Sequence, residues 1–185
     1  MSGRLIYLMG PSGSGKDTVL RGLRGMMGDD CHVVRRIVTR PEPGGDDAEE
    51  VVSDQQFESM RREGRFAMHW QANGMSYGVP VELSRHLSEG RDVLLNGSRA
   101  YFPQARLQYG NVIAVLLRVE AVLLRQRLLH RRRESEEQIA ARLRRNGFYA
   151  SLDAKDGVFV VDNSGDPEQA VTTLYHYLQR TACGK

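Results

Sequence analysis

The sequence has little of several residue types that mark specialised classes of protein. Its only two cysteines, Cys31 and Cys183, are too few and too far apart to suggest a disulfide framework or a cysteine-ligated metal site. No apolar run approaches the length of a membrane span, and the first residues carry no apolar signal segment. We therefore expect a cytoplasmic protein without a membrane partner.

Aromatic residues are also scarce, at 7% of the chain. None interrupts the arginine-rich segment between residues 125 and 145, whereas proteins that bind single-stranded nucleic acid combine basic residues with stacking aromatic rings. We therefore expect no nucleic-acid partner, although the formal net charge is +3. With 41% hydrophobic and 26% charged residues over 185 positions, the chain has the composition of one ordinary globular domain.

One short segment carries most of the functional signal. Residues 10–17 read Gly-Pro-Ser-Gly-Ser-Gly-Lys-Asp, directly after the apolar run 5–9. A glycine, four residues, then Gly-Lys is the spacing of a phosphate-binding loop, whose backbone N–H groups surround a phosphate at the start of a helix. Lys16 can reach the β- and γ-phosphates of a nucleoside triphosphate, so we expect such a nucleotide as donor. Asp17 stands where Ser or Thr is usual.

Apolar runs alternate with helical patterns along the chain, which predicts an α/β fold with a central parallel sheet. The candidate strands are residues 4–9, 32–38, 92–96, 111–118 and 158–162. A helix follows the loop, another spans 54–63 behind Ser53, and the last begins at Asp166 and Pro167. Residues 40–90 are richer in Gly, Pro and polar residues, and we interpret them as an inserted acceptor-binding lobe.

The arginine-rich segment has the pattern of two helices with a hinge. One helix is expected to end near His130 and the next to begin at Ser135, which has capping-box spacing to Gln138. Such a hinge could close over a triphosphate and bring guanidinium groups to the transferring phosphoryl group. Arg127, Arg131 and Arg142 are the arginines that we assign to this role. An exposed basic helix pair is the alternative.

Together these segments resemble guanylate kinase over nearly the whole chain. The matching segments are the loop, Val38-Thr-Arg-Pro41, Trp70 to Gly78, Asp92 to Leu95 and the arginine lid. The resemblance implies the three-layer P-loop NTPase fold in one kinase domain, with a core at 1–39 and 91–185, the lobe at about 40–90 and a lid at about 127–150. It also implies that Arg40 and Tyr77 bind the acceptor's phosphate and that Asn163 lies near adenine.

The departures from guanylate kinase concern the acceptor. Pro43 stands where that family has a second arginine, and a run from Glu49 to Val52 replaces a tyrosine. The segment after Leu95 is Asn96-Gly-Ser-Arg99 instead of a pair of aspartates. A pocket that binds guanine's donors needs carboxylates. We therefore expect poor binding of guanine.

The replacements suit a sugar that bears phosphates. The residues that we assign to the substrate are Arg36, Arg40, Tyr77, Asn96, Ser98 and Arg99. The loop with Asp17, the stretch Val93 to Ala100 and Ala72 to Gly78 are similar to the ribose 1,5-bisphosphate phosphokinases of phosphonate breakdown. That resemblance implies ATP-dependent formation of 5-phospho-α-D-ribose 1-diphosphate. A guanylate or other nucleoside monophosphate kinase is the alternative.

The cofactor expected beside ATP is Mg²⁺. Asp17 is the proposed ligand, directly or through water, and Thr18 is the rival. The nucleotide-binding residues are Gly10, Pro11, Ser12, Gly13, Ser14, Gly15, Lys16, Asp17, Thr18 and Asn163. The nucleophile is already an anion, so no general base is expected. An exposed apolar helix face could support a homodimer.

Overall fold

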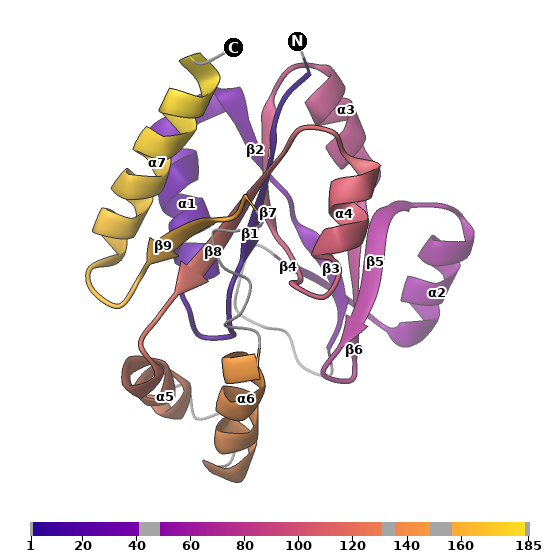
Figure 1. Cartoon of the computed structure of the whole chain (residues 1–185). Coiled ribbons are helices and arrows are strands. Elements are labelled where there is room, and N and C mark those ends of the chain that lie inside the picture. The colour runs from indigo at the N-terminus through magenta and orange to yellow at the C-terminus, as the bar shows by residue number, and fades with distance from the viewer. Residues whose placement is uncertain (1, 41–48, 131–135, 149–156, 184–185) are drawn as a thin grey trace. The chain divides into compact units, whose positions relative to one another are not determined.

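The computed structural model describes residues 2–40, 49–130, 136–148 and 157–183 (Figure 1). These residues form two compact units. Unit 1 comprises Met1–Ile6, Gly28–Leu95 and Ala100–Val112, and unit 2 comprises Tyr7–Met27, Asn96–Arg99 and Ile113–Lys185. Within the described ranges, no helix is both long and apolar enough to cross a membrane.

The strands and helices alternate along most of the chain. Their order is β1 (Leu5–Met9), α1 (Lys16–Met27), a 3₁₀ turn (Gly28–Asp30), β2 (Cys31–Val33), β3 (Arg36–Thr39), β4 (Glu49–Val52), α2 (Asp54–Arg62), β5 (Phe66–Ala72), β6 (Met75–Pro80), α3 (Glu82–Ser88), β7 (Asp92–Asn96), α4 (Phe102–Gln108), β8 (Val112–Arg118), α5 (Ala121–His130), α6 (Glu136–Phe148), β9 (Phe159–Asp162) and α7 (Pro167–Cys183).

The larger sheet has five strands in the order β2-β7-β1-β8-β9. β2 runs parallel to β7, and β8 runs parallel to β9. Every residue of β1 and β7 is buried, as expected for central strands covered on both faces, which read as unbroken apolar runs. The predicted α/β fold with a central parallel sheet is confirmed.

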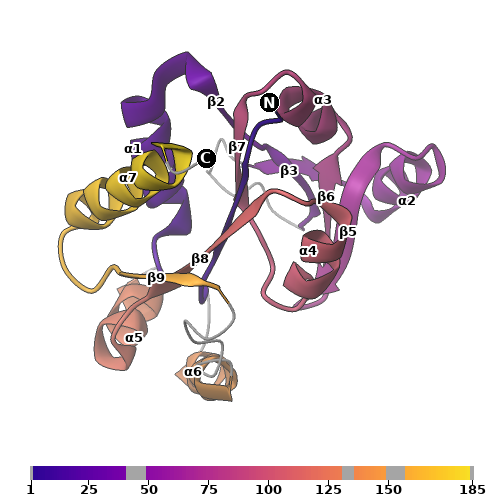
Figure 2. The same cartoon turned by 45° about the horizontal axis from the view of Figure 1, so that its top comes forward.

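Helices α1 and α7 of unit 2 lie side by side (Figures 1 and 2). Gly22 allows this close approach, because a Cβ atom at that position would lie 2.6 Å from Val171 of α7. α7 also covers β9, where the Phe159 ring stacks on Tyr177 with centroids 3.7 Å apart. These contacts hold the helix that follows the phosphate-binding loop against the rest of unit 2.

Unit 1 contains a second sheet, of four strands in the order β4-β3-β6-β5. β3 pairs in parallel with β4 and antiparallel with β6. β5 and β6 form a hairpin whose two-residue turn, Asn73-Gly74, has positive φ angles of 52° and 74°. This is the conformation that Asn-Gly favours between twisted strands. The sheet carries the acceptor-side residues described below.

The strand predictions were accurate within one residue at β1, β7, β8 and β9. The predicted single strand 32–38 was wrong, because the chain leaves the larger sheet after β2 and enters the smaller one at β3. Val34 still donates its backbone N–H to Leu94 O at 2.9 Å, and the break follows at Arg35. A continuous run of β-formers carries no signal for such a change of sheet.

The predicted capping box of α2 is confirmed. Ser53 accepts a hydrogen bond from the Gln56 backbone N–H at 3.2 Å, and the Gln56 side chain accepts one from the Ser53 N–H at 2.9 Å. Behind the cap, Phe57 packs against Phe66 of β5, with ring centroids 4.7 Å apart. The cap therefore fixes the start of the helix that covers the smaller sheet.

Ser53→Ala is expected to lower the free energy of unfolding by about 1 kcal/mol, because it leaves N–H groups of the first turn without their acceptor. Urea denaturation followed by circular dichroism measures this change. Ser88→Ala is the matched control: this exposed serine bonds only the carbonyl of Arg85, near the end of α3. Equal losses in the two variants would contradict the capping account.

Candidate active site

The phosphate-binding loop of unit 2 runs from the end of β1 to the start of α1, as the sequence predicted. Gly13 and Gly15 have φ angles of 88° and 85°, a region that side chains with a Cβ rarely adopt. The loop therefore directs backbone N–H groups toward the N-terminus of α1, where the helix dipole favours an anion. This is the arrangement that a nucleotide phosphate requires.

Lys16 lies over this loop. Its Nζ donates hydrogen bonds to the backbone carbonyls of Gly10 and Pro11, at 3.0 Å each. These carbonyls hold the ammonium at the mouth of the loop, where a β- or γ-phosphate oxygen would be a stronger acceptor because it is charged. This position fits the contact with the β- and γ-phosphates of the nucleotide that the sequence predicted for Lys16.

Asn163, directly after β9, contacts the backbone of the loop. Its side chain is buried, and its Nδ2 donates a hydrogen bond to Ser14 O at 2.7 Å. The resemblance to guanylate kinase places this residue near adenine, and that role stays a prediction. The contact observed here is with the loop backbone, so Asn163 stabilises the loop conformation.

Gly15→Ala is expected to abolish measurable ATP binding while leaving the fold intact. The added Cβ would lie 2.6 Å from Asn163 Nδ2, at a residue whose φ of 85° already disfavours alanine. Isothermal titration with ATP measures the loss. Gly25→Ala is the matched control in the same unit, because a Cβ there meets nothing within 4 Å; wild-type affinity in Gly15→Ala would contradict the account.

The two candidate metal ligands lie in the first turn of α1. Asp17 is half-buried, and its Oδ1 accepts a hydrogen bond from Asn96 Nδ2 at 2.7 Å, whereas Thr18 is exposed. No group of three or more His, Cys, Asp or Glu that could hold a metal ion occurs among the described residues. A carboxylate beside the loop fits Mg²⁺, which is usually held by one or two carboxylates together with phosphate oxygens.

Unit 1 brings together three residues that the sequence assigned to the acceptor. Arg36 Nη2 lies 2.5 Å from Glu49 Oε1, and Arg40 Nη2 lies 2.7 Å from Glu49 Oε2. The Arg36 guanidinium also lies over the Tyr77 ring, 5.4 Å from its centroid. The register of β3 and β4, which pairs Arg36 with Glu49, builds this cluster.

Sequence reasoning missed Glu49. Its carboxylate is only 8% exposed and bridges two arginines, so it holds both guanidinium groups in fixed positions and neutralises one of their charges. The sequence showed that the segment from Glu49 to Val52 lacks the tyrosine that guanylate kinases have there. It did not show that strand pairing places a carboxylate between the two arginines.

Tyr77 keeps its hydroxyl proton in this setting. Burial raises the pKa of the Tyr77 phenol above its usual value, and the nearby Arg36 and Arg40 only partly oppose that shift. Tyr77 can therefore donate a hydrogen bond to an anion. The Trp70 ring stacks on Tyr77, with ring centroids 5.7 Å apart, and is tilted against the Tyr101 ring.

Helix α5 of unit 2 packs on the phosphate-binding loop, and α6 packs on α5. Leu124 and Leu128 of α5 and Ile139 of α6 form an apolar cluster with Val119. The same two leucines lie next to Gly13, where a Cβ would come within 3.1 to 3.2 Å of them. α5 is described as far as His130, so its predicted end near that residue falls at the edge of the described range.

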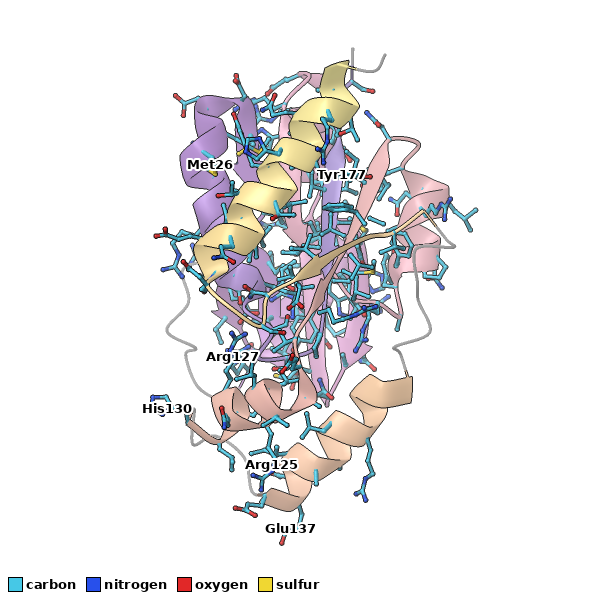
Figure 3. All side chains as sticks on the ribbon, turned by 60° about the vertical axis from the view of Figure 1, so that its left-hand side comes forward. Met26, Arg125, Arg127, His130, Glu137 and Tyr177 are labelled. Atoms are coloured by element: carbon cyan, nitrogen blue, oxygen red, sulfur yellow. The ribbon has the colours of Figure 1, made fainter. Side chains whose placement is uncertain are left out.

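Of the predicted lid arginines, Arg127 is the one whose side chain the structure describes. It is half-buried and extends from α5 on the side of the start of α1, opposite the end that carries Met26, while His130 points away (Figure 3). Arg142 lies in α6, but its side chain is outside the described atoms, and Arg131 and the expected helix start at Ser135 lie outside the described residues. Arg125 pairs with Glu136 across the two helices at 3.5 Å.

Comparison with known proteins agrees with these features. A family model described as an AAA domain matches residues 6–147. Ribose 1,5-bisphosphate phosphokinase PhnN of Pseudomonas paraeruginosa is 50% identical over 181 residues, which cover 96% of each chain. The chain belongs to the ribose 1,5-bisphosphate phosphokinase family. The family's protein from Azotobacter vinelandii is 48% identical over 99% of this chain and 100% of its own length.

Solved structures with the same fold act on different acceptors. Guanylate kinase from Anaplasma phagocytophilum superposes with a TM-score of 0.74 at 20% identity, covering 97% of this chain and 87% of its own. A sugar kinase from Janibacter has a TM-score of 0.56 at 18% identity, covering 96% and 95%. Because such identities establish the fold alone, neither structure identifies the acceptor of this ribose 1,5-bisphosphate phosphokinase family member.

Proposed function

We propose that this protein transfers the γ-phosphoryl group of ATP to ribose 1,5-bisphosphate, forming 5-phospho-α-D-ribose 1-diphosphate. The observation that carries the proposal is the 50% identity to a named ribose 1,5-bisphosphate phosphokinase over 96% of both chains. The loop geometry supports ATP as donor, and the cluster of Arg36, Arg40 and Tyr77 supports an acceptor that bears a phosphate.

The chemistry needs alignment and charge stabilisation more than proton transfer. An oxygen of the sugar's 1-phosphate forms a bond to the γ-phosphorus, the bond from that phosphorus to the β-phosphate oxygen breaks, and ADP leaves with the electron pair. Because the nucleophile is already an anion, no catalytic His or Glu is required. Lys16, Arg127, Arg131 and Arg142 are proposed to neutralise the charge on the transferring group.

Mg²⁺ would be held through Asp17, with Thr18 as the rival ligand. When bound, the ion offsets the negative charge of the β- and γ-phosphates. Asp17 would otherwise place a negative charge beside the phosphates, so its presence in the first turn of α1 is best explained by a cation between them. The loop Gly10 to Gly15 would surround the phosphates with the backbone N–H groups of its residues other than Pro11.

On the acceptor side, Arg36, Arg40 and Tyr77 are proposed to bind one phosphate of the sugar. Ser98 and Arg99 of unit 2, both half-buried, are also proposed to bind the substrate. Since the two arginines already share Glu49, an incoming phosphate would compete with that carboxylate or add to the network. Either way the guanidinium groups are positioned before the substrate arrives, which lowers the entropic cost of binding it.

The decisive assay follows ADP release from MgATP with ribose 1,5-bisphosphate, ribose 5-phosphate or GMP as acceptor. Ribose 1,5-bisphosphate is expected to give the highest kcat/KM by a wide margin. Efficient turnover of GMP alone would refute the proposed acceptor and favour the alternative, a guanylate kinase. A higher rate with ribose 5-phosphate would refute the proposal that the acceptor site binds two phosphates of the sugar.

Two further expectations concern the location of the enzyme in the cell and its oligomeric state. We propose that the enzyme acts in the cytoplasm, where ATP is abundant, which localisation of a tagged chain would test. The expected homodimer rests on the sequence, and light scattering coupled to size-exclusion chromatography would test it.

A further inference from the structure

We propose that Asn96 is a positioning residue for Asp17 and belongs to the metal side of the donor site. This inference rests on the proposed function and changes the role that the sequence suggested for Asn96, which was contact with the sugar. The observation is the hydrogen bond from Asn96 Nδ2 to Asp17 Oδ1, at 2.7 Å, between residues 79 positions apart in the chain.

The segment that carries Asn96 is fixed firmly to β1. The Tyr7 side chain is fully buried, and its hydroxyl donates to Ser98 O at 2.9 Å. The Gly97 backbone N–H donates to Leu8 O, also at 2.9 Å. A Cβ at Gly97 would lie 2.2 Å from the Tyr7 ring, so only glycine lets the turn lie this close. Asn96 is thus held by β1 itself.

The burial of Asn96 argues against a role on the substrate. The residue is 5% exposed, and its Nδ2 already has Asp17 as a partner. An amide that is covered and already bonded has little surface to offer a sugar phosphate. Its amide is instead directed at the first turn of α1, within the same unit 2.

An amide is well suited to orient a metal-binding carboxylate. A lysine or arginine at this position would also hold Asp17, but its positive charge would oppose a divalent cation. The neutral Asn96 amide restrains the carboxylate through Oδ1 and leaves its full negative charge, with Oδ2, for the ion. Hydrogen-bonding partners of metal ligands typically contribute 10- to 100-fold to metal affinity. Asp17 and Asn96, both unusual relative to guanylate kinase, then form one functional pair.

The test measures metal binding directly, without turnover. Mn²⁺ binding to the protein with saturating AMP-PNP is followed by electron paramagnetic resonance for wild type, Asn96→Ala, Asn96→Leu, Asp17→Asn and the double variant Asp17→Asn/Asn96→Ala. We expect each Asn96 variant to raise the Mn²⁺ Kd by about 10- to 100-fold. In the Asp17→Asn background, Asn96→Ala should add little further change, because its partner's charge is already gone.

Two controls separate positioning from general damage. Asn96→Leu keeps a branched side chain of the same length at the buried position and removes its amide, and Asn111→Ala removes a half-buried asparagine whose Nδ2 bonds Gly3 O at 3.3 Å, in unit 1. Melting temperatures report on folding, and Asn111→Ala should keep wild-type Mn²⁺ affinity.

Unchanged Mn²⁺ affinity in folded Asn96→Leu would overturn the inference, as would fully additive effects of the Asp17 and Asn96 changes. If the Asn96 variants showed a raised KM for ribose 1,5-bisphosphate and unchanged Mn²⁺ binding, Asn96 would be assigned to the acceptor site instead. Because the binding experiment contains no acceptor, it can succeed even where ribose 1,5-bisphosphate proves to be the wrong substrate.

Discussion

Lys16→Met is expected to lower kcat by about 10²- to 10³-fold, the usual loss when one group that stabilises transition-state charge is removed. The Nζ lies over the phosphate-binding loop, bonded to Gly10 O and Pro11 O. Methionine keeps most of the side chain's length and loses its charge. Single-turnover formation of ADP, with enzyme in excess of ATP, measures the chemical step apart from product release.

Arg21→Met is the matched control for this experiment. Arg21 is an exposed cation of α1, one turn beyond Lys16. The same loss of one positive charge should leave the single-turnover rate near the wild-type value. Equal rates in Lys16→Met and wild type would show that the loop does not act on the transferring phosphoryl group.

Glu49→Ala is expected to lower the free energy of unfolding by about 3 kcal/mol, because it removes the carboxylate that pairs with buried Arg36 and with Arg40. Loss of one partner of a buried ion pair exposes the desolvation penalty of the other. Thermal or urea unfolding measures the change. Glu50→Ala is the control next in sequence: Glu50 is exposed, and its loss should change stability by less than about 0.5 kcal/mol.

The same variant tests whether this cluster binds phosphate. A phosphate ion that binds Arg36 and Arg40 would replace part of the missing negative charge and would stabilise the folded chain by mass action. Inorganic phosphate should therefore raise the melting temperature of Glu49→Ala more than that of wild type or Glu50→Ala, relative to chloride at equal ionic strength. Equal responses in all three proteins would contradict an anion site at these arginines.

Features that depend on local spacing could be predicted from the sequence. The phosphate-binding loop needs a strand, two glycines in the left-handed region and a helix start, and all of them lie within residues 5–27. The capping box at Ser53 is equally local. The family and its kinase activity were also identified correctly, because the motifs extend over most of the chain.

Features that depend on strand pairing could not be predicted in the same way. The role of Glu49 follows from the register that sets it beside Arg36, which no spacing along the chain reveals. The contact of Asn96 with Asp17 likewise depends on where the turn after β7 lies against β1. One signal was present and overlooked: Asn73-Gly74 between alternating residues predicts the β5–β6 hairpin.

The most direct test of the account is the ³¹P NMR spectrum of the product made from ATP and ribose 1,5-bisphosphate. We expect an unchanged 5-phosphate monoester, together with a new diphosphate whose inner phosphorus couples to the anomeric proton. A diphosphate attached at C5 would contradict the assignment of the nucleophile. No sugar diphosphate at all, with GMP converted to GDP under the same conditions, would contradict the proposed function itself.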